Sequence, residues 1–301
     1  MNQIAKTTKG TKGPRLGERA FPRFMLSPSL IIMTVMTAYP LLFTFYYSFT
    51  NYNYLKHHSK SPDFVLFKNY VDIITNEYFQ QAVWNTVKFT LLAVVFEMFF
   101  GLIVAVFVNS LGRGQKTMRT LILLPYLLPA VTVALSWRML LSPNYGIANQ
   151  VLTSLGLPVY NWFMDIKTAF GTVLLIDVWQ NIPFVFLLLY ASLQGVSQSQ
   201  YEAARIDGAG VIQQFWYVTL PNIKNGLALC ALLRTIDTFR LFEKVNILTG
   251  GGPAGTTSTI TQYLYLYGIS NLKFGFGSAG AIVMTVLVLI LSSFYIKRAI
   301  K

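Results

Sequence analysis

Long apolar segments dominate this chain of 301 residues and limit what it can fold into. A helix needs roughly 20 mainly apolar residues to cross the hydrocarbon core of a bilayer. Only 12% of the residues are charged, whereas the share in soluble proteins is roughly 25%. The sequence therefore predicts an all-α membrane protein with six transmembrane helices. We expect them at about 26–49, 84–108, 119–141, 169–191, 225–248 and 275–296.

The positions of lysine and arginine predict the orientation, because basic residues are enriched in cytoplasmic loops. With the N-terminus inside, fourteen basic residues near the helix ends fall on the inner side and five on the outer side. We therefore expect both termini in the cytoplasm, with 1–25 as a cytoplasmic basic tail and 26–301 as a single transmembrane domain. The apolar run after the tail is too long for a signal peptide and lacks an A-x-A-like cleavage site, which predicts an uncleaved first span.

The formal net charge of +13 could also point to nucleic acid. The basic residues lie between apolar segments rather than along one face, so membrane topology explains them and no nucleic-acid partner is expected. The single cysteine, Cys230, excludes an intrachain disulfide. His57 and His58 have no further ligand at a suitable spacing, so we expect no metal site.

The sequence also lacks a nucleotide-binding loop. No lysine followed by serine or threonine comes after Gly250–Gly252, and at 112–117 Gln115 replaces the glycine that must precede the lysine. We therefore expect no catalytic residue and no bound cofactor in this chain.

The loop at about 192–224, on the predicted cytoplasmic side, contains its own folding signals. Ser199 and Glu202 have the spacing of a capping box, which predicts the start of a short helix. Gly208 and Gly210 allow a sharp turn where a residue with a Cβ would be strained. The loop is thus expected to form a helix followed by an elbow.

A second short helix is expected after the elbow, over 211–218, and Pro221 suits the first turn of the helix that re-enters the membrane. A compact helix with small residues on such a loop can dock into a groove of a partner protein.

This loop resembles the hallmark of the permease subunits of binding-protein-dependent ABC importers, E-A-A-x-x-D-G-A followed by F, by I or V, and by L-P. The matching residues are Glu202, Ala203, Ala204, Asp207, Gly208, Ala209, Phe215, Val218, Leu220 and Pro221. The resemblance implies a type I importer permease fold in a prokaryotic plasma membrane. It also implies that the loop contains a coupling helix, which sits in a cleft of the ATPase. The expected coupling residues are Glu202, Ala203, Ala204, Asp207, Gly208, Ala209 and Gly210.

The same resemblance implies the partners: a second permease subunit, two ATPase subunits that bind ATP and Mg, and an extracytoplasmic solute-binding protein, besides membrane lipid. Further segments look like the sugar-transporting branch, which includes the maltose and glycerol-3-phosphate permeases. These segments are Phe67, Asn69 and Tyr70, Trp179–Phe184 and Thr249–Pro253. A sugar, polyol or oligosaccharide is therefore the expected solute. One alternative is a charged organic solute. Another, an ATP-independent secondary transporter, would leave the loop motif unexplained.

Charged residues inside the fifth apolar segment must face protein or water, because each costs about 2.5–3.5 kcal/mol at the centre of a bilayer. They are Arg234, Asp237, Arg240, Glu243 and Lys244. On a continuous helix, Asp237, Arg240 and Lys244 would form one narrow stripe. Two interpretations follow, and we favour the second: an internal ion-pair ladder through Asp237, or the polar wall of a substrate path.

The fourth apolar segment offers further candidates for the substrate path. Asp177, Gln180 and Asn181 precede Pro183, so polar side chains coincide with a possible kink. Prolines are also expected to bend or interrupt other spans, at Pro40, Pro125 and Pro129. Outside the predicted site, Glu97 is expected to be paired structurally and Lys88 to reach the outer interface.

Overall fold

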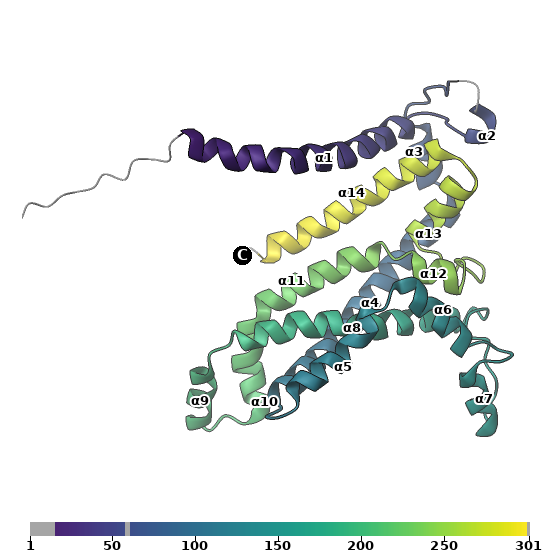
Figure 1. The fold of residues 1–301 in the computed structure, drawn as a ribbon. Coiled ribbons are helices and arrows are strands. Elements are labelled where there is room, and N and C mark those ends of the chain that lie inside the picture. The colour runs from purple at the N-terminus through teal and green to yellow at the C-terminus, as the bar shows by residue number, and fades with distance from the viewer. Residues whose placement is uncertain (1–15, 58–60, 300–301) are drawn as a thin grey trace, which may run out of the picture.

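The computed structural model describes residues 16–57 and 61–299, and these residues form a helical protein (Figure 1). Within them, one isolated β-bridge joins Thr50 and Phe64. Residues 1–15 of the predicted basic tail, His58, Lys60 and Lys301 lie outside the described residues. The helices are α1 (Leu16–Ser48), α2 (Tyr54–His57), α3 (Lys68–Ile74), α4 (Glu77–Ser110), α5 (Gln115–Leu127), α6 (Ala130–Leu140), α7 (Ile147–Ser154), α8 (Ala169–Gln194), α9 (Gln198–Ile206), α10 (Val211–Gln214), α11 (Leu220–Phe239), α12 (Glu243–Leu248), α13 (Ile260–Leu264) and α14 (Phe274–Ala299), with π-helical turns η1 (Phe215–Thr219) and η2 (Tyr265–Ser270).

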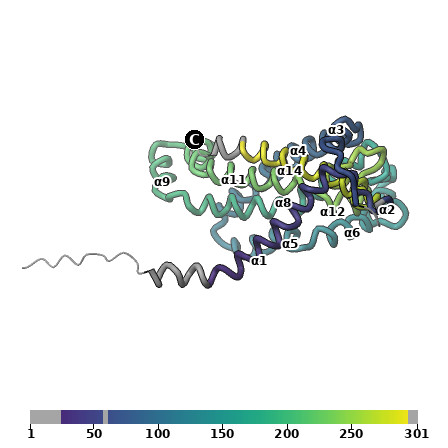
Figure 2. The backbone as a smooth tube through the Cα atoms, turned by 90° about the horizontal axis from the view of Figure 1, so that it is seen from above, coloured from purple at the N-terminus to yellow at the C-terminus, as the bar shows by residue number. Residues whose placement is uncertain are grey.

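The long helices run between two opposite ends of the molecule, as Figures 1 and 2 show from two directions. The loop containing α9 and α10, the α4–α5 connection and the C-terminal end of α14 lie at one end. Helices α2, α3, α12 and α13 lie at the other. The chain passes between these ends along α1, α4, α5 with α6, α8, α11 and α14.

Within the described residues, four helices are long and apolar enough to cross a membrane: Met25–Ser48 of α1, α4, α8 and Phe274–Ser293 of α14. Helices α5 and α6 meet at an angle of 88°, and together they are apolar enough to add a fifth span if the bent pair counts as one. The break falls at Leu128 and Pro129, which confirms the predicted interruption at Pro129. The other prolines, Pro40, Pro125 and Pro183, lie inside uninterrupted helices.

The prediction of one continuous helix over 225–248 is wrong. Helix α11 ends at Phe239, and α12 begins only at Glu243. The break frees the carbonyl of Leu241, which accepts hydrogen bonds from the hydroxyls of Thr259 at 2.9 Å and Thr261 at 2.5 Å. The charged residues of this segment therefore belong to two helices and the turn between them, not to one stripe.

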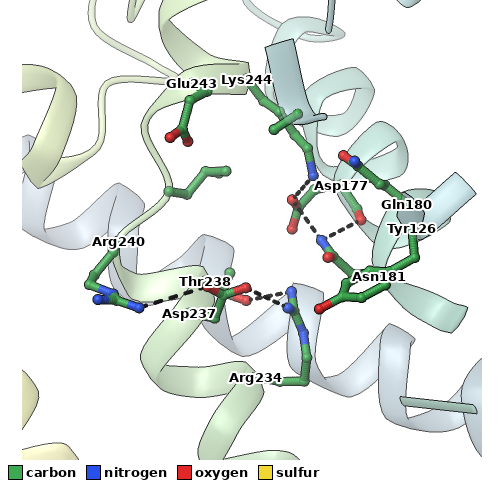
Figure 3. A pocket seen from close by; sticks show the side chains of 12 residues that line it. Tyr126, Asp177, Gln180, Asn181, Arg234, Asp237, Thr238, Arg240, Glu243 and Lys244 are labelled. Carbon is green, nitrogen blue, oxygen red and sulfur yellow. Dashed lines mark hydrogen bonds and ion pairs between the residues drawn. The ribbon is translucent and has the colours of Figure 1, made fainter. Parts of the chain in front are cut away.

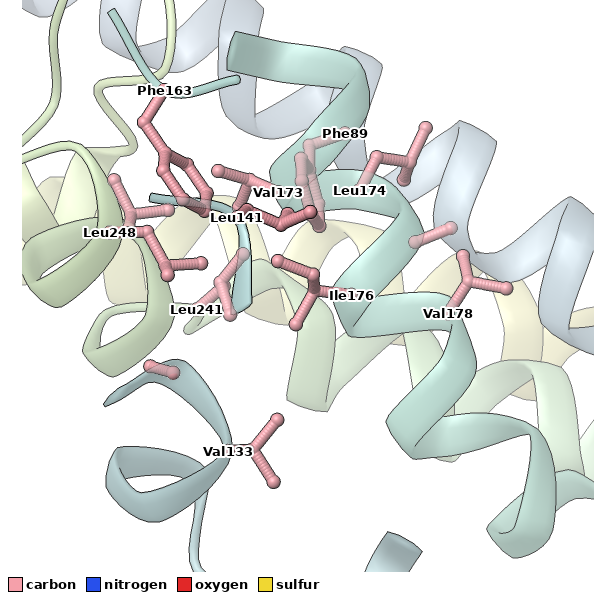
Figure 4. Packing of buried hydrophobic residues seen from close by; sticks show 13 residues of the cluster. Phe89, Val133, Leu141, Phe163, Val173, Leu174, Ile176, Val178, Leu241 and Leu248 are labelled. Carbon is pink, nitrogen blue, oxygen red and sulfur yellow. The ribbon is translucent and has the colours of Figure 1, made fainter. Parts of the chain in front are cut away.

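Helices α4 and α8 form the centre of the fold. Gly101 on α4 permits their close approach, since a Cβ there would lie 2.5 Å from Cγ1 of Val185 on α8. Toward the end of the molecule that holds α12, Phe89 of α4 and Val173 and Ile176 of α8 belong to a buried apolar cluster shared with α6 and α12 (Figure 4). By contrast, α1 packs beside α14, and none of the residues in its most apolar stretch is buried.

Candidate functional site

The predicted coupling loop folds as two short helices joined by an elbow. Helix α9 ends at Ile206, and Gly208 has a φ of +81°, the left-handed conformation that glycine adopts without strain. The expected turn at Gly208 is therefore confirmed. Gly210 has a φ of −68° and a ψ of 168°, an extended conformation open to any residue, so the prediction that Gly210 must be glycine is wrong.

The predicted capping box at the start of α9 is also wrong. The helix begins one residue before Ser199, its N-cap is Ser197, and no side chain caps it. The Ser199 hydroxyl instead lies 2.8 Å from the hydroxyl of Ser197. A glutamine interaction of the capping-box type occurs at the second helix, where the Gly210 amide donates to Oε1 of Gln213 at 2.9 Å.

Two side-chain hydrogen bonds tie α9 to the start of α11. The hydroxyls of Tyr201 and Thr219 lie 3.0 Å apart, and Asn222 Nδ2 donates to Gln200 Oε1 at 2.7 Å. The elbow itself exposes apolar side chains, with Ile206 87% and Val211 83% exposed. The loop thus exposes a small apolar surface, and these two hydrogen bonds join the loop to the start of α11.

A cavity of about 520 Å³ lies where α5, α6, α8, α11 and α12 approach one another (Figure 3). It brings together all seven residues predicted for the substrate path. Four of them were expected on one helix over 225–248, which the structure divides into α11 and α12. The seven residues are Asp177, Gln180, Asn181, Arg234, Asp237, Arg240 and Glu243. Tyr126 and Thr238, which the sequence pattern did not single out, also line it, together with Lys244 of the predicted stripe. Pro125, directly before Tyr126, was the available sequence signal for Tyr126.

Arg234 is buried at the base of the cavity and has several partners. Its Nε donates to Oε2 of Glu97 at 2.7 Å and its Nη2 to Oε1 of Glu97 at 3.0 Å. Its Nη1 donates to Oδ2 of Asp237 at 2.7 Å. The expectation that Glu97 is paired structurally is confirmed. Lys88, for its part, has its Nζ 4.7 Å from the ring centre of Phe170.

Of the two ion pairs in the ladder interpretation, the one between Arg234 and Asp237 is close and the one between Arg240 and Asp237 is weak. Arg240 Nη2 lies 3.9 Å from Asp237 Oδ1, and both side chains are more than 60% exposed. An exposed pair of this kind contributes little to stability. Arg240 therefore has its charged head available to the cavity, whereas Arg234 does not.

A second ion pair lies on the other wall of the cavity. Lys244 Nζ lies 2.5 Å from Oδ1 of Asp177, and Asn181 Nδ2 donates to the same oxygen at 3.0 Å. In the lining of this cavity, two buried acceptors have no hydrogen bond with a described residue, Oδ2 of Asp177 and Oε1 of Gln180. A buried acceptor without a partner is costly, so these oxygens favour a ligand or water that donates hydrogen bonds.

The cavity is suited to binding. Three carboxylates and three cations line it, and within the described residues no group of three or more His, Cys, Asp or Glu side chains could hold a metal.

Residues 97–300 match the family described as the inner membrane component of binding-protein-dependent transport systems. The chain belongs to this family. It is therefore a multi-pass permease subunit of the inner membrane and the non-catalytic membrane component of its importer.

Relatives of this permease cover nearly the whole chain. It is 35% identical to the trehalose/maltose transport system permease of Thermococcus litoralis, over 91% of each chain. It is 33% identical to the sulfoquinovosyl glycerol transport system permease of Agrobacterium fabrum, over 94% of this chain and 91% of the relative. The fold matches a chain of a bacterial ABC transporter that imports alginate, with a TM-score of 0.82 at 21% identity, over 95% of this chain and 98% of the other. The permease thus has the type I importer fold.

Proposed function

We propose that this permease, with a second permease chain, forms the translocation path for a sugar, polyol or oligosaccharide. The observation that carries the proposal is the pair of buried, unbonded acceptors in the cavity, Oδ2 of Asp177 and Oε1 of Gln180. Sugar hydroxyls are hydrogen-bond donors of matching chemistry, and hydrogen bonds to a carboxylate are the stronger kind. The relatives named for trehalose/maltose and diacetylchitobiose transport support the same solute class.

The charges of the cavity favour a neutral solute. Arg234 and Lys244 are already held by Glu97 and Asp177, so neither offers a free positive charge. A charged organic solute is the second candidate, and the exposed Arg240 head is the observation that favours it. Relatives named for sulfoquinovosyl glycerol and sn-glycerol-3-phosphate transport are a second reason to test a charged solute.

We propose six spans, namely α1, α4, α5 with α6, α8, α11 and α14, with both termini cytoplasmic, a cytoplasmic tail at 1–25 and one domain over 26–301. The path of the chain between the two ends of the molecule supports this topology. Helix α11 is not among the helices that are apolar enough by composition alone, and Lys224, Arg234 and Asp237 lie on it. The buried contacts of Arg234 make this charge compatible with a span.

The loop residues Glu202–Gly210 would couple the permease to two ATPase subunits. Closure of the ATPases would move α9, and the contacts of Tyr201 with Thr219 and of Gln200 with Asn222 would pass the movement to α11. The other end of α11 holds Arg234 and Asp237 at the cavity. One helix would thus connect the docking site to the substrate path.

The test uses the permease assembled in lipid with its partner permease, its ATPases and its solute-binding protein. ATP hydrolysis is expected to rise when the binding protein is loaded, and a panel of neutral sugars and anionic sugar derivatives identifies the class that stimulates it. Stimulation by anionic derivatives alone favours the second candidate. Transport by this chain alone, driven by a proton or sodium gradient, contradicts the proposal.

A further inference from the structure

Three lysines surround a hollow of about 480 Å³ at the end of the molecule opposite α9. Lys56 comes from α2, Lys68 from the start of α3, and Lys273 directly precedes α14. All three side chains are exposed, and none forms an ion pair with a described residue. Asp72 is the one carboxylate in the lining, so positive charge is in excess. We call this hollow the lysine cup.

An apolar groove of about 550 Å³ runs between α1 and α14 beside the cup. Its lining includes Phe43 of α1, Leu264 and Ile269 of α13 and η2, and Phe274 and Ala281 of α14. No charged residue lines it. An apolar ligand would therefore bind in the groove by burying apolar surface, and not by pairing with a charge.

The cup and the groove share a wall. Lys273 lines the cup and the next residue, Phe274, lines the groove. The ring of Tyr52, in the lining of the cup, stacks on the ring of Phe274 with their centres 5.8 Å apart. A ligand in both places would have an anionic part near the lysines and an apolar part along α14.

The cup also lies at a depth suited to a headgroup. Helix α1 ends at Ser48 and α14 begins at Phe274, so the cup is at the ends of two predicted spans. Tyr52 lines the cup, and Tyr54, at the start of α2, is 51% exposed. Tyrosine and tryptophan are enriched at the level of the lipid headgroups.

We propose that the lysine cup and the groove together bind one anionic phospholipid, with its phosphate among Lys56, Lys68 and Lys273 and an acyl chain along α14. A lipid fits both hollows, because the positive cup and the apolar groove adjoin at Lys273 and Phe274, at the ends of two proposed spans. Under the topology proposed above, it is a lipid of the outer leaflet. The bound lipid would fill the space between α1 and α14 and hold these two helices together.

The experiment measures lipid retained by the assembled importer, by mass spectrometry after extensive detergent washing and re-addition of defined lipids. The importer is expected to retain phosphatidylglycerol and to release phosphatidylcholine. The triple variant Lys56→Gln, Lys68→Gln, Lys273→Gln is expected to lower the affinity for phosphatidylglycerol about a hundredfold. Ala281→Phe, which fills the groove and leaves the lysines in place, is expected to lower it as well.

Matched controls separate this site from general charge effects. Lys167 is exposed near the same end, outside the cup, and Lys167→Gln is compared with the single change Lys273→Gln. Only Lys273→Gln is expected to lower retention, and the single changes also serve if the triple variant fails to assemble. Equal retention of the two lipids, or unchanged retention in the cup variants, overturns the proposal. So does binding of inorganic phosphate with no retention of lipid, or a loss of affinity for the solute-binding protein in the cup variants with no loss of lipid.

Discussion

Arg234 on α11 and Glu97 on α4 form a two-pronged ion pair in which neither side chain is more than 2% exposed. These residues are 137 positions apart in the chain. Because a charge at this depth requires a partner, the pair fixes which face of α11 meets α4. Asp237 and Thr238 lie on the same face of α11, where both accept hydrogen bonds from Arg234 and line the cavity with it.

Removing one partner of this pair is expected to destabilise the permease. Glu97→Ala would leave Arg234 buried without its main counter-charge, at a cost of about 3–5 kcal/mol. The thermal midpoint of the purified complex should fall, and Glu243→Ala should change it little because Glu243 is exposed. The paired change Glu97→Leu with Arg234→Met should recover much of the loss, since an apolar pair can replace a buried ion pair. Equal midpoints for Glu97→Ala and the parent would contradict the structural role.

Arg240→Ala is expected to separate transport from stability. The side chain is 62% exposed and its nearest carboxylate is 3.9 Å away, so its removal should leave the complex assembled. Solute uptake should fall severalfold if the guanidinium contacts solute in the cavity. Uptake and gel filtration are measured on the same preparations. Loss of the assembled complex would instead favour the ladder interpretation, and unchanged uptake would remove Arg240 from the substrate path.

Close packing of α4 on α8 gives a prediction independent of charge. A Cβ at position 101 would lie 2.5 Å from Val185, so Gly101→Ala should overpack the interface and cost about 1–3 kcal/mol. Gly171→Ala on α8 is the matched control, because nothing lies within 4 Å of the Cβ it would add. Adding Val185→Ala to Gly101→Ala should restore part of the stability, as measured by thermal unfolding. No difference between Gly101→Ala and Gly171→Ala would contradict the close approach.

Features that depend on neighbouring residues could be predicted from the sequence. The start of α8, the left-handed turn at Gly208 and the interruption at Pro129 follow from apolar length, glycine and proline, and the structure has all three. The candidate site was also found, because charged side chains in apolar segments are costly wherever they occur. The residue types identified seven residues of the cavity lining, but neither Tyr126 and Thr238 nor the geometry.

The break after Phe239 could not be predicted, because its causes lie far away in the chain. Lys244 pairs with Asp177, 67 residues earlier, and the freed carbonyl of Leu241 is satisfied by Thr259 and Thr261. The prediction of one continuous helix rested on helical periodicity, which gives no information on contacts between residues so far apart in the chain. The start of α9 was misplaced for a smaller reason: Ser197 and Ser199 are both acceptable caps, and spacing to Glu202 alone favoured the wrong one.

The elbow of the proposed coupling loop gives a test of the link to the ATPase. At a φ of +81°, a residue with a Cβ at position 208 costs about 1–2 kcal/mol more than glycine, although no atom lies within 4 Å to clash with it. Gly208→Ala should therefore shift the elbow through backbone strain alone. Gly208→Leu should add bulk on the docking surface, and retention of the ATPase on pull-down should fall further.

Position 210 supplies the matched control for this elbow. Gly210 is extended, and its added Cβ would meet nothing closer than Gln213 Oε1 at 3.8 Å, so Gly210→Ala should retain the ATPase. The membrane-inserted amount of permease is measured alongside and should not change, because the loop lies outside the apolar helices. If Gly208→Leu retains the ATPase and supports uptake like the parent, Glu202–Gly210 is not the coupling element. If Gly210→Ala loses the ATPase as fully as Gly208→Leu, the effect does not come from the left-handed turn.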